Sequence, residues 1–196
     1  MARIPLIPSD DPDAVRHGVF SSFEAEQREP IDLYRALANV PELLLAYRSL
    51  PQHLRHAATT PRRLRELAVL RVAQLVGSAY EWSHHRPMAL KAGVTQAQLD
   101  ALVSWRDSDR FDADERPVLA AVEAVHDVSL SDAEFTALEE RLGRQGAVEI
   151  VVAVAQYEAT ARIIQALGVD VEPSYAPHLV GFEQVRAQVP RGGRAG

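Results

Sequence analysis

The 196-residue chain contains no cysteine. It therefore cannot form disulfide bonds, bind a metal through thiolates or use a cysteine nucleophile. A secretory signal is also missing from the first residues, because MARIPLIPSDDPD has no apolar core and carries acidic residues early. On this ground we expect a cytoplasmic protein.

Long hydrophobic runs and an excess of positive charge are missing too. The longest apolar stretch, residues 147–155, contains Glu149 and is too short to span a bilayer. The formal net charge of −6 disfavours binding to nucleic acid or to an anionic membrane. Hydrophobic residues still make up 47% of the chain, which is enough for a globular core. We therefore expect neither nucleic acid nor a membrane as a partner.

No segment sustains the period-two alternation that marks a strand, so we predict an all-α fold. Helix starts are indicated by capping pairs three residues apart: Ser78 with Glu81, Thr95 with Gln98, Asp112 with Glu115, and Ser131 with Glu134. Thr60 before Pro61 gives an N-cap followed by proline at the first helical position. The predicted helices cover residues 13–27, 32–38, 41–57, 61–76, 79–92, 96–104, 113–127, 132–142 and 147–167.

These helices are expected to form one domain over residues 1–172, followed by an irregular tail over residues 173–196. Two of the helices, at residues 67–76 and 147–164, are apolar on almost every side. Such a helix lies either at the centre of a core or against another subunit. We therefore expect self-association as a homodimer, trimer or hexamer, with the 61–92 hairpin near a subunit contact, although one large core could also absorb both helices.

The densest group of chemically active side chains is SAYEWSHH, at residues 78–85. Ser78, Glu81 and His85 are three and then four residues apart, so they share one face of a helix. A carboxylate and an imidazole supply a base and an acid near neutral pH, which is the minimum needed to move a proton between carbon and oxygen. The free N–H groups of the first helical turn could hold an anionic substrate group there.

Simpler explanations exist for these residues. Glu81 could only close a capping box with Ser78, and His85 could be an interior histidine bonded to a backbone carbonyl. His84 points to another part of the helix surface. Tyr80 and Trp82 could line a pocket or pack in the core, and the same alternatives apply to Tyr157 near the C-terminus.

Two charged side chains in apolar helices need partners. Glu66 could act in the site or form an ion pair with Arg62 or Arg63. Arg71, inside LAVLRVAQLV, requires an anion, either an internal carboxylate such as Glu149 or the carboxylate of a substrate. The histidines show no metal-site spacing, because neighbours such as His84 and His85 project about 100° apart on a helix. We therefore predict no metal site.

Residues 61–95, PRRLRELAVLRVAQLVGSAYEWSHHRPMALKAGVT, resemble the central helical hairpin of the carboxymuconolactone decarboxylase and AhpD-like superfamily. DLYRAL at 32–37, PELL at 41–44 and QYEATARIIQALGV at 156–169 also resemble that family. The resemblance implies an AhpD-like helical bundle around the hairpin. In the peroxidase branch, the conserved glutamate corresponds to Glu66, the two cysteines to Ser78 and Glu81, and the histidine to His85.

The departure from that pattern decides one point, because thiol peroxidase chemistry needs one thiolate to attack and a second thiol to resolve the intermediate. Serine and glutamate can do neither. The resemblance therefore implies cofactor-independent acid–base chemistry, of decarboxylase, lyase or isomerase type, on a small organic acid, lactone or carbonyl compound. His85, Glu81 and Glu66 are the predicted catalytic residues. The predicted substrate-binding residues are Ser78, Tyr80, Trp82, His84, Arg71 and Tyr157. The alternative is a non-catalytic scaffold that binds a ligand or only assembles.

Overall fold

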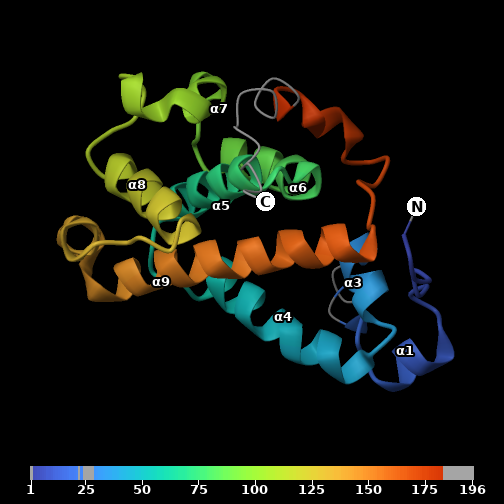
Figure 1. Cartoon of the computed structure of the whole chain (residues 1–196). Coiled ribbons are helices and arrows are strands. Elements are labelled where there is room, and N and C mark those ends of the chain that lie inside the picture. Colours follow the sequence, from blue (N-terminus) through green and yellow to red (C-terminus); the bar gives the residue numbers. More distant parts are fainter. Residues whose placement is uncertain (1, 22, 24–28, 183–196) are drawn as a thin grey trace, which may run out of the picture.

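The computed structural model in Figure 1 describes residues 2–21, 23 and 29–182. All regular elements in this part of the chain are helices, as the sequence predicts, and it contains no strand. The α-helices are α1 (Pro12–Arg16), α3 (Asp32–Leu37), α4 (Pro41–His56), α5 (Arg62–Val76), α6 (Ala79–Lys91), α7 (Gln96–Ala101), α8 (Glu115–His126) and α9 (Asp132–Leu167). Two 3-10 helices, η1 (Leu102–Asp107) and η2 (Ala176–Leu179), complete the set. None of the described helices is both long and apolar enough to cross a membrane.

The α5–α6 hairpin lies at the centre of the fold. In Figure 1, the long helix α9 runs across the molecule with the hairpin on one side and α4 on the other. Helix α5 packs against α6, α8 and α9, and every residue from 64 to 74 is buried. The largely apolar surface of its second half is thus covered within a single chain, which is the arrangement expected for a helix that is apolar on almost every side.

The turn between α5 and α6 is set by two residues. Gly77 ends α5 with φ 68° and ψ 35°, a left-handed conformation that glycine adopts without steric cost. The next residue, Ser78, caps α6, because its side chain accepts a hydrogen bond from the backbone N–H of Glu81 at 3.2 Å. This tight connection folds α6 back along α5.

The other predicted capping pairs are present. Thr95 with Gln98 and Ser131 with Glu134 form complete capping boxes at the starts of α7 and α9. Before α8, Asp112 accepts from the N–H of Glu115 at 2.9 Å, and Glu115 accepts from the N–H of Asp112 at 2.8 Å. Short-range capping chemistry was therefore a sound guide to where these helices begin.

Some predicted boundaries were wrong. Thr60 does not cap α5, because its N–H and hydroxyl both bind the carboxylate of Glu149, at 2.7 and 2.6 Å, and Pro61 takes the N-cap position. The helix expected over 13–27 ends at Arg16, and positions 22 and 24–28 lie outside the described residues. The break expected between the helices over 132–142 and 147–167 is present, because α9 is interrupted by non-helical backbone at Gly143 (φ 69°, ψ 168°).

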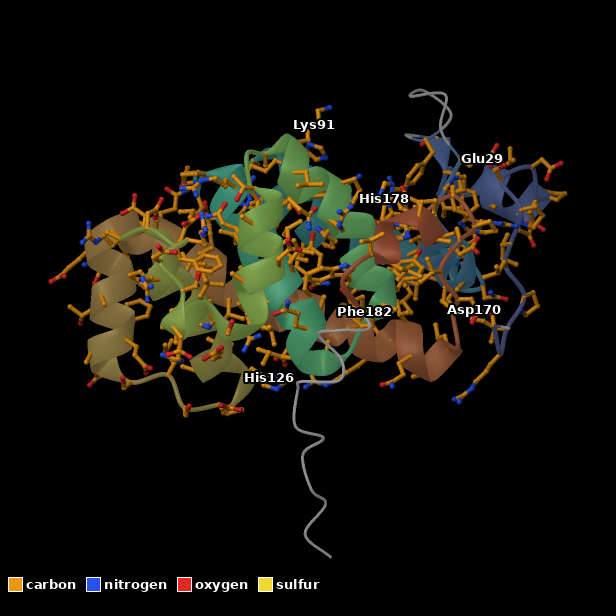
Figure 2. All side chains as sticks on the ribbon, turned by 90° about the horizontal axis from the view of Figure 1, so that it is seen from above. Glu29, Lys91, His126, Asp170, His178 and Phe182 are labelled. Carbon is orange, nitrogen blue, oxygen red and sulfur yellow. The ribbon has the colours of Figure 1, made fainter. Side chains whose placement is uncertain are left out.

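Beyond α9 the chain returns to the central hairpin. Figure 2 labels Asp170, His178 and Phe182, and the segment that joins them runs beside α6. Trp82 of α6 donates a hydrogen bond from Nε1 to the carbonyl of Val180 at 3.3 Å. Its ring centroid lies 6.1 Å from that of Phe182, which is 1% exposed. The described part of the segment expected to be irregular is therefore packed onto the hairpin and helps to form the site.

Candidate functional site

A cavity of about 150 Å³ opens between α4, α6 and α9, with α3 and the C-terminal segment closing its sides. Its wall includes side chains from all five of these parts of the chain. The lining residues are Phe23, Ile31, Leu33, Tyr34, Tyr47, Arg48, Pro51, Gln52, Arg55, His56, Tyr80, Glu81, His84, His85, Met88, Tyr157, Thr160 and Tyr175. The first helical turns of α6 therefore face a space that a small molecule can occupy.

The imidazole of His85 lies on this wall between two carboxylates. Its Nδ1 is 2.8 Å from Oε2 of Glu66, and its Nε2 is 3.4 Å from Oε2 of Glu81. Tyr157 packs against the ring edge to face, with the centroids 4.8 Å apart and the planes at 85°. His85 is thus held in one orientation by contacts on three sides.

Glu66 reaches His85 from the facing helix of the hairpin. Its other oxygen, Oε1, accepts a hydrogen bond from Nε of Arg62 at 3.1 Å, so one of the two predicted arginine pairings is present. Burial alone would raise the pKa of Glu66, but His85 and Arg62 outweigh it and lower that pKa below its usual value. Glu66 is therefore ionised at neutral pH and accepts a hydrogen bond from Nδ1 of His85, so Nε2 is the ring nitrogen that faces Glu81.

The carboxylate of Glu81 does not close a capping box. The cap uses the backbone N–H of Glu81, whereas the backbone N–H of Ser78 donates to the carbonyl of Ala73 at 2.8 Å. The Glu81 side chain is 4% exposed and lies against the cavity and His85. Burial raises the pKa of Glu81 to about 7; Glu66 adds to this effect, and His85 and Arg55 oppose it. A carboxylic acid that titrates near neutral pH is thus in contact with an oriented imidazole.

His84 belongs to a second pair of a histidine and a carboxylate on the same wall. Its Nε2 lies 2.7 Å from Oε2 of Glu172, and its ring is stacked between Tyr80 and Tyr175, with centroids 4.2 and 3.6 Å away. Glu172 also accepts hydrogen bonds from the hydroxyl of Tyr80 and the backbone N–H of Asp32, both at 2.8 Å. This network fastens the C-terminal segment to α6 and α3.

The structure brings together five of the nine residues predicted for the site on one cavity wall. These are His85, Glu81, His84, Tyr80 and Tyr157. Glu66 does not line this cavity, but it contacts His85, which does. Ser78 acts as the cap of α6 and lines a separate pocket beside α9, together with His126 and Arg162.

Trp82 and Arg71, which were predicted to bind substrate, do not line this cavity. Trp82 projects from the other side of α6 toward the C-terminal segment. Arg71 binds Glu123 through Nε and Nη2, at 3.1 and 2.6 Å. Arg71 thus has an internal carboxylate as its partner, as expected, but this is not Glu149, which instead accepts hydrogen bonds from the loop before α5.

Several side chains of the cavity were not predicted from the sequence. Helix α4 contributes Tyr47, Arg48 and Arg55, and the C-terminal segment contributes Tyr175. Among the described residues, no group of three or more histidine, aspartate or glutamate side chains is suited to hold a metal ion. The only feature of the sequence that could have indicated the α4 residues is their spacing, because positions 48, 51 and 55 fall on one helical face.

Comparison with known proteins points to one family. The sequence model of the carboxymuconolactone decarboxylase family matches residues 32–124. No curated protein matches the sequence significantly. Among solved structures, the debrominase Bmp8 without ligand is 21% identical with a TM-score of 0.74, covering 90% of this chain and 97% of its own.

Two further solved structures share the fold. An uncharacterized peroxidase-related protein with an alkylhydroperoxidase AhpD core, from Ralstonia eutropha JMP134, is 18% identical with a TM-score of 0.74, covering 94% of this chain and 96% of its own. Another peroxidase-related protein, from Silicibacter sp. TM1040, has the same identity and TM-score, with 89% and 93% covered. At these identities the structures establish the AhpD-like fold.

Proposed function

We propose that this chain, which contains no cysteine and whose residues 32–124 match the carboxymuconolactone decarboxylase family, is a cofactor-independent acid–base enzyme. Its reaction is of the decarboxylase, lyase or isomerase type, and its substrate is a small organic acid, lactone or carbonyl compound. One observation carries the proposal. The carboxyl group of Glu81, with a pKa of about 7, lies on a cavity wall 3.4 Å from the oriented ring of His85.

In this reaction, Glu81 and His85 act as a pair that shares one proton. Ionised Glu66 accepts a hydrogen bond from the Nδ1–H of His85, so that Nε2 is the nitrogen that exchanges a proton with Glu81. A substrate carbon or oxygen in the cavity gives its proton to this pair or takes one from it. An acid whose pKa lies near the working pH is well matched to both directions of transfer.

Besides proton transfer, such a reaction requires that an enolate be stabilised. Phenol groups around the cavity can do this. Burial raises the pKa of Tyr157, and it raises that of Tyr47 to about 12. Both phenols therefore stay protonated and able to donate hydrogen bonds at neutral pH. Donors fixed in a cavity with little water stabilise negative charge that develops on a substrate oxygen.

The residues exclude the thiol chemistry found elsewhere in the superfamily. The two positions that would hold the dithiol carry Ser78 and Glu81, and the sequence contains no cysteine at any position. Neither a hydroxyl nor a carboxylate can form the mixed disulfide that peroxide reduction requires. Only the proton-transferring part of such a site is left.

The proposal is tested by following hydrogen exchange and CO₂ release. A panel of 2-oxo acids, 3-oxo acids and γ-lactones would be incubated with the protein in D₂O and followed by proton NMR. At least one member is expected to exchange or lose CO₂ faster than in buffer, and Glu81→Gln should abolish this gain. His53→Ala is the matched control, because His53 is exposed on α4 and does not line the cavity.

The alternative is a non-catalytic scaffold that binds a ligand in the same cavity. It predicts saturable binding without turnover for every member of the panel, and that result would replace the enzyme proposal. Self-association also stays a proposal. The chain itself covers α5, so this helix gives no support for self-association. The support comes from exposed apolar side chains on α4, namely Leu43, Leu45 and Leu50.

A further inference from the structure

Arg55 places a half-buried positive charge on the wall of the cavity. Its Nη2 donates to the hydroxyl of Tyr34 at 2.9 Å, and its Nε donates to the carbonyl of Pro51 at 3.2 Å. Both partners are neutral. Within the described part of the chain, no carboxylate forms an ion pair with Arg55, whereas Arg62 and Arg71 each have one.

A guanidinium group has five N–H bonds, of which these two contacts use two. The Nη1 group has no hydrogen-bond partner among the described residues, so the end of the guanidinium fork keeps donors for a ligand. A cation removed from water is stabilised when an anion pairs with it. The planar fork matches the two oxygens of a carboxylate in a bidentate arrangement.

Arg55 and the proton-transferring pair belong to the same cavity. The positive charge of Arg55 is felt at Glu81, where it favours the ionised form. Tyr34, Tyr47 and Tyr157 supply flat surfaces around this space. A carboxylate bound to Arg55 would therefore leave the body of the ligand between tyrosines, with its reacting end toward Glu81 and His85.

The volume limits what can bind. A cavity of about 150 Å³ is comparable to an engineered apolar cavity that holds benzene. We propose that Arg55 anchors the carboxylate of the substrate, which makes the substrate a small, flat monocarboxylate about the size of one ring. This assignment rests on the proposed function, since it uses the same cavity and the same reacting residues.

The test measures binding of two probes of the same shape, benzoate and uncharged benzamide, by isothermal titration calorimetry. The unmodified protein is expected to bind benzoate at least about tenfold more tightly than benzamide, as one charged hydrogen-bonded contact implies. Arg55→Met should remove that preference by weakening benzoate alone. Arg55→Lys keeps the charge but loses the fork, and should restore part of it.

Arg86→Met is the matched control, because it removes one positive charge from α6 next to His85 without lining the cavity. Its benzoate affinity should equal that of the unmodified protein. The benzoate preference of the unmodified protein is a readout that does not depend on how well Arg55→Met folds. Three results would each overturn the assignment. These are equal binding of both probes, no binding of benzoate, and undiminished benzoate binding in Arg55→Met.

Glu81→Gln separates this inference from the proposed function. The variant should still bind benzoate, because Arg55 is intact, while any turnover should be lost. Benzoate binding without turnover of any carboxylate in the panel would reject the enzyme proposal and leave the anchor standing. Turnover without a carboxylate preference would reject the anchor and leave the enzyme proposal standing.

Discussion

The buried carboxyl group of Glu81 should make the stability of the protein depend on pH, and replacing it with glutamine should remove that dependence. In the unfolded chain its pKa is the ordinary value of 4.5, and in the folded protein it rises to about 7. The folded state therefore binds the Glu81 proton more tightly than the unfolded state. This contribution to stability is complete below pH 4.5 and is lost as the pH rises through 7.

The size of the effect follows from the shift in pKa. A difference of about 2.5 pKa units at about 1.36 kcal/mol per unit gives roughly 3 kcal/mol. Because Glu81 is only 4% exposed, solvent screening reduces this figure little. The free energy of unfolding of Glu81→Gln, relative to that of the unmodified protein, should rise by about this amount between pH 4.5 and pH 8.

Urea unfolding followed by circular dichroism at pH 4.5, 6, 7 and 8 would measure this difference, with both proteins in the same buffers. Groups that titrate alike in the two proteins cancel in the comparison. If the two stability curves stay parallel over this range, the pKa of Glu81 is the same in the folded and unfolded protein, and the carboxyl group is ionised at neutral pH. Glu81 could then not act as the proposed acid near neutral pH.

Four further outcomes are expected. His85→Ala should lower the turnover of any substrate found by roughly 100- to 10,000-fold, with an unchanged circular dichroism spectrum; an unaffected kcat would rule out a role for the imidazole in proton transfer. Glu172→Gln should lower the free energy of unfolding, measured with urea, by about 1–3 kcal/mol, because it weakens the contacts with His84 and Tyr80. The exposed Glu42→Gln is the control and should leave that free energy unchanged. Dithiol-dependent reduction of alkyl hydroperoxides should not exceed the rate in buffer, and clear turnover would contradict the argument from the missing cysteines. Analytical ultracentrifugation should show a species heavier than the 21.6 kDa chain, and a monomer at micromolar concentration would contradict self-association.

The hairpin half of the site could be predicted because short-range signals define it. Gly77 and Ser78 fix the turn, and the pairing of Glu66 with His85 was implied by the resemblance of the hairpin to the family. The i,i+4 spacing gave the contact of Glu81 with His85. Local chemistry and helical geometry are enough for such pairs, since no distant part of the chain has to be placed.

The other half depends on contacts between distant segments, which periodicity does not determine. Arg55 lies on a helix with many polar residues, and nothing in its neighbourhood distinguishes it from a solvated arginine until α4 is packed beside α6. Glu172 is 88 residues beyond His84 and follows the end of α9 at Gly168. The wrong partner assigned to Arg71 has the same origin, because both Glu123 and Glu149 are on helices that pack against α5.

At the start of α6, helix capping does not compete with the acid–base chemistry that we propose for the neighbouring Glu81. In a complete capping box the N3 carboxylate turns back to the N-cap N–H, and a glutamate used in this way cannot face a ligand. Here the N–H of Ser78 already donates to Ala73, through the backbone bond that closes the end of α5. The Glu81 carboxylate is therefore not needed at the helix end and is directed into the cavity instead. The same turn that folds α6 back along α5 thus leaves Glu81 available to share a proton with His85.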